Sequence, residues 1–255
     1  MRNGVGVPQH VVLFGGTSEI GLAVLEGLVG PGVAHVTLVC RDVEAGERAA
    51  AALRNLGEDV HIEIVRFDAS DARAMTDVVA ETCSEGGDID VAIVAQGVLG
   101  QDADHYEGPD ALVEVMSVNA TATMALLYAL AARMRGQGYG RIVLLSSVAG
   151  QRPRKSNPVY GASKAAVDTF ATALDHDLEG TGVSILVVRP GFVESRMTSG
   201  MKKAPFSTTP KGVADVVVPA VNSSRHVVHA PRILSTVFAL FRLLPEKVWR
   251  RLPLN

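Results

Sequence analysis

The stretch "HVVLFGGTSEIGLAVLEGL" (residues 10–28) joins a short β-branched run, a glycine-rich turn and a longer helical pattern. Glycines in such a turn allow backbone N–H groups to approach a pyrophosphate at the positive end of the helix. Thr17 and Ser18 offer further donors. The stretch therefore predicts a strand–turn–helix unit that binds a dinucleotide, and the alternative is a tight turn without a ligand. The glycines concerned are Gly15, Gly16 and Gly21.

The same strand-then-helix pattern repeats along the chain. Most of the β-branched runs are continuously apolar, as in strands buried on both faces, and longer Ala-, Leu- and Glu-rich stretches separate them. This α/β pattern predicts one Rossmann-type, doubly wound parallel sheet of seven strands in a single domain, residues 1–230. The predicted strands are residues 10–14, 35–40, 61–67, 91–96, 141–146, 183–189 and, more weakly, 225–230.

The composition is that of a soluble protein or of one peripheral to a membrane. The 255 residues are 47% hydrophobic, enough for one large core, and a net charge of −3 gives no reason to expect nucleic-acid binding. Cys40 and Cys83 suit neither a disulfide framework nor a metal site, so we expect reduced thiols in the cytoplasm and no metal. We also expect no signal peptide, and no apolar run of the roughly 18 to 20 residues that span a bilayer.

The end of the second predicted strand bears on the choice of dinucleotide. A carboxylate there binds the ribose 2′-hydroxyl of NAD, whereas an arginine suits the 2′-phosphate of NADP. In "LVCRDVEAG" (38–46), Cys40 stands at the carboxylate position and Arg41 follows, which favours NADP, although Asp42 is adjacent. After the third strand, Asp68 fits two roles, as an acceptor for the adenine amino group or as the cap of the next helix.

A second stretch, "SSVAGQRPRKSNPVYGASK" (146–164), carries Tyr160 and Lys164 four residues apart, on one side of a predicted helix. A tyrosine with a pKa of about 10 is a poor acid or base at neutral pH, and a nearby ammonium lowers that pKa. Ser147 ends the fifth predicted strand, at the edge where open α/β sheets bind ligands. Asn119 lies in the preceding helical pattern, where alone it would be interpreted as a helix-interior amide bonded to the backbone.

Up to about residue 230 the chain resembles the short-chain dehydrogenase/reductase family. The resemblance rests on Asn119, Ser147, Tyr160 and Lys164 in the family's order and spacing, and on "RPGFVESRM" (189–197). It implies that Tyr160 protonates the carbonyl oxygen during reduction and that Ser147 orients this carbonyl. Lys164 is expected to hold the nicotinamide ribose and lower the tyrosine pKa, and Asn119 to position a water in the proton relay.

The resemblance also implies a set of dinucleotide contacts. Pro190 and Gly191 would shape the nicotinamide pocket, with Val193 and Ser195 near the carboxamide. The full implied set is Gly15, Thr17, Ser18, Ile20, Arg41, Asp68, Ala95, Gly97, Tyr160, Lys164, Pro190, Gly191, Val193 and Ser195.

Two positions and one stretch depart from the family pattern. The glycine-rich turn of the family begins with threonine and has a central glycine, where this chain has Phe14 and Glu19. Glu19 must turn its carboxylate away from a pyrophosphate, because like charges repel. After the fourth strand "VAQG" (94–97) replaces Asn-Asn-Ala-Gly, so the contacts on the adenosine side are the least certain part of the resemblance.

A closer likeness within the family is to reductases of a 2-keto-pentose joined to a polyprenyl chain through a phosphate. It rests on "GGTSEIGLA", "GDIDVAIVA", "SSVAGQRPRKSN", "VYGASKA" and the terminal "RRLPLN". It implies that the protein is the reducing half of a two-enzyme epimerase, with a flavin oxidase as partner, that makes the arabinose donor for cell-wall arabinan. Family members usually form homo-oligomers through the helices that hold Asn119 and Tyr160. The likeness implies NADH whereas Arg41 favours NADP, so the cofactor is NADH or NADPH.

Three cations follow the proposed catalytic serine. Arg152, Arg154 and Lys155 fit the phosphate of such a substrate, the arginines bidentately and the lysine as a point charge. The alternative is a solvated surface loop. Residues 198–210 correspond to the family's substrate lid, where Lys202 and Lys203 either add to the phosphate site or belong to a mobile surface loop.

Residues 231–255 form a basic amphipathic tail with a helix predicted over 233–244. At about 18 Å that helix is short of the roughly 30 Å bilayer core, which suits an interfacial anchor at the inner face of the plasma membrane. Trp249 and the cations around it would then lie at headgroup level. The alternatives are a dimer contact or a helix over the substrate pocket. The apolar stripe is Ile233, Leu234, Val237, Phe238, Phe241 and Leu244, and after Pro245 the cations are Lys247, Arg250 and Arg251.

The sequence thus predicts an NAD(P)H-dependent reductase of a polyprenylphosphoryl keto-pentose. One alternative is a short-chain reductase of another lipid or small-molecule ketone. The other is a non-catalytic dinucleotide-binding scaffold for the flavin oxidase.

Overall fold

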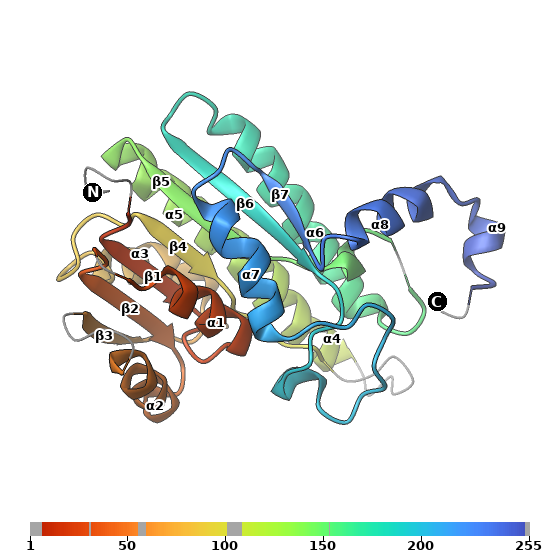
Figure 1. The fold of residues 1–255 in the computed structure, drawn as a ribbon, viewed down its shortest axis with the longest axis horizontal. Coiled ribbons are helices and arrows are strands. Elements are labelled where there is room, and N and C mark those ends of the chain that lie inside the picture. The colour runs from red at the N-terminus through yellow and green to blue at the C-terminus, as the bar shows by residue number, and fades with distance from the viewer. Residues whose placement is uncertain (1–6, 31, 56–59, 101–108, 153, 253–255) are drawn as a thin grey trace.

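Seven parallel strands form one sheet through the centre of the molecule (Figure 1). The computed structural model describes residues 7–30, 32–55, 60–100, 109–152 and 154–252. The strand order β3-β2-β1-β4-β5-β6-β7 reverses direction between β1 and β4, which is where doubly wound sheets bind ligands. The predicted Rossmann-type fold is confirmed. The strands are β1 (His10–Phe14), β2 (His35–Cys40), β3 (His61–Arg66), β4 (Val91–Val94), β5 (Gly140–Leu145), β6 (Val183–Pro190) and β7 (Val227–Ala230).

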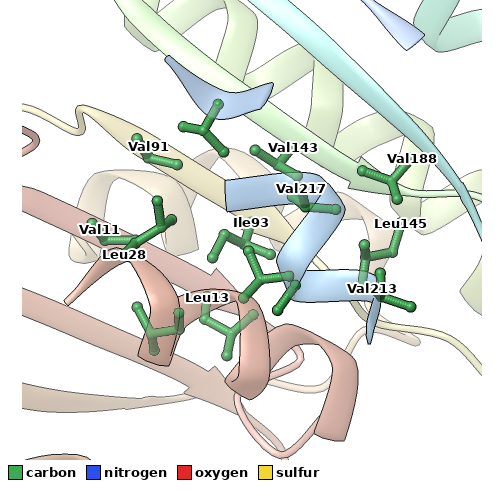
Figure 2. Packing of buried hydrophobic residues seen from close by; sticks show 14 of the residues in the cluster. Val11, Leu13, Leu28, Val91, Ile93, Val143, Leu145, Val188, Val213 and Val217 are labelled. Carbon is green, nitrogen blue, oxygen red and sulfur yellow. The ribbon is translucent and has the colours of Figure 1, made fainter. Parts of the chain in front are cut away.

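Helices cover both faces of the sheet. Because side chains alternate along a strand, Val11 and Leu13 of β1 enter one apolar layer, and Val12 and Phe14 enter the other. Figure 2 shows the first layer, which α1 and α7 close. This double burial explains why the strands are continuously apolar in sequence. The helices are α1 (Glu19–Leu28), α2 (Val43–Arg54), α3 (Met75–Glu81), α4 (Pro109–Met116), α5 (Thr123–Gln137), α6 (Pro158–Asp177), α7 (Pro210–Val221), α8 (Leu234–Leu243) and α9 (Glu246–Trp249).

A π-helical turn, residues 117–122, joins α4 and α5 into one continuous helix. By length and composition this helix, Pro109–Gln137, would suffice to cross a membrane, contrary to our expectation that no apolar run is long enough. Half of its most apolar part is buried inside the protein, and it packs against α3 and α6. It therefore has the burial of a core helix.

The segment after β7 folds into α8 and α9, which project from one end of the molecule (Figure 1). As predicted, α8 ends just before Pro245. Leu234 and Phe238 pack against Val148, beside the predicted catalytic serine. The position predicted for Trp249 is wrong, because its side chain is only 1% exposed and packs against the Phe241 ring instead of standing at a headgroup level. Residues 253–255, the end of the predicted tail, lie outside the described residues, as do residues 1–6.

Candidate active site

The glycine-rich turn folds back against the ends of two strands. The N–H groups of Gly15 and Gly16 both donate to the Val39 carbonyl of β2, each at 2.9 Å. Gly15 has φ +82°, and a Cβ there would lie 2.7 Å from the Gln96 nitrogen, so only glycine fits. Ser18, predicted as a donor, caps α1 as an acceptor of the Gly21 N–H. The turn thus brings the backbone and the positive end of α1 to the switch point of the sheet.

A cavity of about 670 Å³ opens beside this turn, at the carboxyl ends of the strands. Its volume lies within the roughly 300–1,000 Å³ of typical cofactor sites, and the glycine cradle at its wall suits a pyrophosphate. A dinucleotide therefore fits the residues present. Of the predicted contacts, the cavity is lined by Gly15, Thr17, Ser18, Ile20, Arg41, Asp68, Ala95, Gly97 and Ser195. The predicted contacts Tyr160, Lys164, Pro190, Gly191 and Val193 do not line it.

Glu19 turns its carboxylate to Arg196, as the predicted repulsion from a pyrophosphate requires. Its Oε2 accepts the Arg196 backbone N–H at 2.6 Å, and the Arg196 guanidinium donates to the Thr17 carbonyl at 2.7 Å. The pair joins the glycine-rich turn to the segment after β6. Our sequence reasoning missed Arg196, whose only signal is a cation directly after the predicted contact Ser195.

The ends of β5 and α6 bring together the predicted catalytic side chains. Ser147 directly follows Ser146 at the end of β5, is buried, and hydrogen-bonds through its hydroxyl to the Tyr160 hydroxyl on α6. Lys164, one turn further along α6, donates from Nζ to the Leu145 carbonyl at 3.0 Å. Its Nζ lies 5.9 Å from the centre of the Tyr160 ring. A proton donor, a hydroxyl partner and an ammonium therefore share one site.

The electrostatics of this site differ from the prediction. Burial raises the pKa of Tyr160 above its usual value, and the hydrogen bond from Ser147 only partly offsets this effect. Lys164 does not lower the pKa of Tyr160 as predicted. Its ammonium instead donates to the Leu145 carbonyl, and its charged form is destabilised by burial. Burial lowers the pKa of Lys164 to about 8, although the charge of Asp168 acts in the opposite direction. In this state Tyr160 holds its proton at neutral pH.

Asn119 lies fully buried in the π-helical turn and binds the loop after β4. Its Nδ2 donates to the Val98 carbonyl at 2.7 Å and to the Ser163 hydroxyl at 3.2 Å, while its Oδ1 accepts the Val98 N–H at 2.8 Å. A Cβ on Gly97 would lie 3.2 Å from Asn119 Oδ1 and 3.6 Å from Lys164 Nζ. Asn119 is thus a helix-interior amide bonded to backbone, as the alternative interpretation had it, but that backbone belongs to the loop after β4. Through Val98 it fixes the loop that carries Gly97, a residue of the cavity wall that lies close to Lys164 Nζ.

A buried ionic network, which sequence reasoning missed, holds α6 to the sheet. The Asp168 carboxylate accepts from the Arg189 guanidinium at 2.7 and 3.0 Å and from the Ser146 hydroxyl at 2.7 Å. Asp168 lies one turn after Lys164, and Ser146 precedes Ser147. The network thus ties together the three elements, β5, β6 and α6, whose ends form the catalytic site.

The basic loop after Ser147 turns out to contact the C-terminal segment. The Arg152 guanidinium donates to the carbonyls of Phe241 and Leu244, and lies 4.9 Å from the Trp249 ring. At Arg152 the loop is therefore not solvated, as one interpretation had it. These contacts also engage the Arg152 guanidinium, which we predicted to bind phosphate. Arg154 lies over the Phe238 ring, 5.6 Å from its centre. Lys155 is exposed.

The segment corresponding to the substrate lid pairs with the residues after β6. Thr208 donates its backbone N–H to Phe192 and accepts from Glu194, and Lys203 forms a 2.6 Å ion pair with Glu194. Gly191 lies so close to α8 that a Cβ there would be 2.6 Å from Leu234 Cδ1. The lid segment and α8 therefore meet at the predicted nicotinamide side of the site.

Comparison with known families agrees with this geometry. Residues 9–205 match the short chain dehydrogenase family. The chain belongs to this family. It is therefore an NAD(P)-dependent short-chain oxidoreductase, and the non-catalytic scaffold is no longer needed as an alternative.

Relatives and solved structures of short-chain dehydrogenases extend this comparison. The chain is 42% identical to an uncharacterized oxidoreductase of Mycobacterium tuberculosis over 243 residues, which are 95% of this chain and 96% of the relative. It is 32% identical to a 3-dehydrosphinganine reductase of Arabidopsis thaliana over 186 residues, 71% of this chain and 54% of that protein. The fold matches a short chain dehydrogenase from Burkholderia cenocepacia in complex with NADP, with a TM-score of 0.79 and 19% identity, over 96% of this chain and 98% of the other.

The end of β2 in this short-chain dehydrogenase places a cation at the wall of the cavity. Arg41 is exposed at the cavity wall, whereas the Asp42 carboxylate is engaged in capping α2 through the Ala45 N–H. The buried Cys40 thiol donates to the Asp42 carbonyl, and burial raises its pKa. Asp68 accepts the Ser70 N–H at 2.9 Å, but the cap of the next helix is Asp71, so the capping alternative for Asp68 is wrong.

Replacing Arg41 tests the preference for NADPH. We expect Arg41→Ala to raise KM for NADPH about tenfold and leave KM for NADH within about twofold, because only the 2′-phosphate gains from a charge-assisted hydrogen bond. Steady-state kinetics with both dinucleotides measure this. Arg48→Ala, an exposed arginine on α2 outside the cavity, is the control. An equal rise for both dinucleotides would contradict the prediction.

Proposed function

We propose that this short-chain dehydrogenase reduces a ketone that is attached to a lipid through a phosphate, in the first instance a polyprenylphosphoryl 2-keto-pentose. The product of that reduction is the arabinose donor for cell-wall arabinan. A flavin oxidase is the proposed partner that supplies the ketone, and the protein acts in the cytoplasm as a homo-oligomer.

The chemistry follows from the side chains at the ends of β5 and α6. Bound NAD(P)H supplies the hydride to the carbonyl carbon. Tyr160 stays protonated at neutral pH, because burial raises its pKa, and its hydroxyl delivers the proton to the carbonyl oxygen. Ser147, already bonded to that hydroxyl, orients the carbonyl for the transfer. The Lys164 ammonium, half protonated at about pH 8, holds the nicotinamide ribose.

The environment of the Arg154 guanidinium supports the presence of a phosphate group on the substrate. Its Nε is buried and has no hydrogen-bond partner among the described residues, and burial lowers its pKa with no acidic group acting in the opposite direction. A desolvated guanidinium is costly unless an anion binds it, and phosphate matches its planar fork. The Phe238 ring of α8 lies beside it. An anion site next to an apolar helix suits a lipid phosphate.

A second candidate substrate is a lipid ketone without a phosphate. The similarity to the plant 3-dehydrosphinganine reductase favours this class. Both candidates share the roles of Tyr160, Ser147 and Lys164, and they differ in whether Arg154 contributes to substrate binding.

Transfer of deuterium identifies the substrate. The purified protein is incubated with the flavin oxidase, polyprenylphosphoryl ribose and NADPH or NADH deuterated at the nicotinamide C4. We expect deuterium in the arabinose product. If none appears with either dinucleotide although both bind, the keto-pentose proposal is wrong, and a 3-keto sphingoid base is tested in the same way.

Replacing Arg154 tests the phosphate contact separately. We expect Arg154→Met to lower kcat/KM at least tenfold for the phosphate-linked ketone and less than twofold for a small uncharged ketone, because a charge-assisted hydrogen bond contributes roughly 1.5–3 kcal/mol. Arg48→Met is the matched control. Equal losses on both ketones would mean that Arg154 only supports the loop.

A further inference from the structure

Helix α8 is apolar on two sides. Its inner stripe, Leu234 and Phe238, is buried against Val148. Its outer side carries Leu240 and Leu243, which are 59% and 80% exposed, and Ile233, just before the helix, is 52% exposed. These three residues follow one another at spacings of seven and three, so they form a second stripe along the helix. An amphipathic helix at a protein surface normally keeps its outer side polar.

Basic side chains accompany this outer stripe in the C-terminal segment. Residues 231–252 contain five cations and one acid, whereas the whole chain has a net charge of −3. All five cations are exposed, and the one acid, Glu246, pairs with Arg250 at 3.0 Å and with Arg152 at 3.7 Å. The cations are Arg232, Arg242, Lys247, Arg250 and Arg251. The C-terminal segment thus combines an exposed apolar stripe with a net positive charge on an otherwise acidic protein.

An anionic surface suits this pattern better than a second copy of the chain. In a two-fold pair the segment would face itself and bring like charges together. Three aliphatic side chains on a helix of about 15 Å also cover much less than the roughly 800 Å² per partner of a stable interface. A helix of that length cannot cross the roughly 30 Å bilayer core, so it would lie in the plane of a membrane surface.

We propose that α8 and the residues that follow it bind the protein to an anionic lipid surface, with Ile233, Leu240 and Leu243 entering the bilayer interface and the cations meeting the headgroups. The buried Trp249 and Phe238 hold α8 on the protein and do not enter the lipid. This differs from the anchor predicted from sequence, in which Trp249 and a stripe that includes the buried Leu234 and Phe238 contact the membrane, and of that stripe only Ile233 belongs to the outer one. The proposal rests on the exposed stripe and its charge and is independent of which ketone is reduced.

Co-sedimentation of the full chain with vesicles tests the proposal. We expect binding to vesicles of phosphatidylcholine with about one third phosphatidylglycerol, and at least tenfold weaker binding to phosphatidylcholine alone, because each basic side chain near an anionic surface strengthens binding by roughly fivefold. Raising the salt from about 0.1 M to 1 M shortens the Debye length from about 10 to 3 Å and should release the protein. Equal binding to both vesicle types, or to neither, overturns the proposal.

Variants separate the outer stripe from other exposed apolar groups. The double variant Leu240→Glu/Leu243→Glu should bind the anionic vesicles at least tenfold more weakly. Leu112→Glu/Val113→Glu, two exposed apolar residues of α4, should bind like the unchanged protein. Fluorescence of Trp249, the single tryptophan, reports whether α9 stays packed, and turnover of a soluble ketone should be unchanged. Unchanged vesicle binding by the α8 variant, or a loss of oligomer without a loss of vesicle binding, overturns the proposal.

Discussion

Tyr160→Phe should reduce the rate of ketone reduction by about a thousandfold or more while the dissociation constant of the dinucleotide stays within about twofold. General acid catalysis contributes roughly 10²–10⁴ in rate, and among the described side chains only Tyr160 combines a hydroxyl proton with a hydrogen bond to Ser147. The dinucleotide cavity is lined by other residues, so its affinity should not change. Single-turnover oxidation of the reduced nicotinamide measures the rate, and fluorescence titration measures the affinity.

A matched control for this substitution is Tyr128→Phe. Tyr128 lies exposed on α5, so loss of its hydroxyl should change neither the rate nor the affinity. Ser147→Ala provides a second comparison, because it removes the hydrogen bond that partly offsets the rise of the Tyr160 pKa. Retention of more than about a tenth of the rate by Tyr160→Phe would remove Tyr160 from the role of proton donor.

The fold could be predicted from the sequence because its signals are local. A strand buried on both faces is continuously apolar, and all seven runs became strands with boundaries shifted by two residues or fewer. The glycine-rich turn could also be predicted from the sequence, because Gly15 has a left-handed backbone conformation and lies close to the Gln96 backbone, which only glycine allows. What local patterns could not predict is the π-helical turn, because its sequence "SVNATA" is ordinary for an α-helix, whereas its Asn119 binds Val98, which lies 21 residues away in the sequence.

The predicted site was incomplete for a related reason. The four predicted catalytic residues do converge, but what positions them lies far away in sequence. Arg189 reaches Asp168 across 21 residues, and Arg152 reaches Phe241 across 89. Neither the hydrophobic periodicity nor the motifs of the sequence predict contacts between residues so far apart in the chain. The expectation that Lys164 lowers the Tyr160 pKa was wrong. The spacing of four residues predicts that the two side chains lie close together on the helix, but it does not predict that the Lys164 ammonium donates to the Leu145 carbonyl.

Asp168→Ala should lower the free energy of unfolding by about 3–5 kcal/mol, because it leaves the Arg189 guanidinium buried without its carboxylate and the Ser146 hydroxyl without its acceptor. The two charged side chains are only 11% and 13% exposed, so solvent screens the pair little. A loss of this size is a large part of the roughly 5–15 kcal/mol that stabilises a typical domain. Urea denaturation followed by circular dichroism measures it.

The double variant Asp168→Leu/Arg189→Met distinguishes a buried unpaired charge from a general defect in packing. Replacing both partners by apolar side chains removes the unpaired charge, so most of the lost stability should return. Catalysis should not return with it, since the network also fixes α6, which carries Tyr160 and Lys164, to the end of β5 that leads to Ser147. The control is Asp215→Ala in the exposed Lys211–Asp215 pair, where we expect a loss below about 1 kcal/mol. If Asp168→Ala costs no more than this control, the network does not hold the site together.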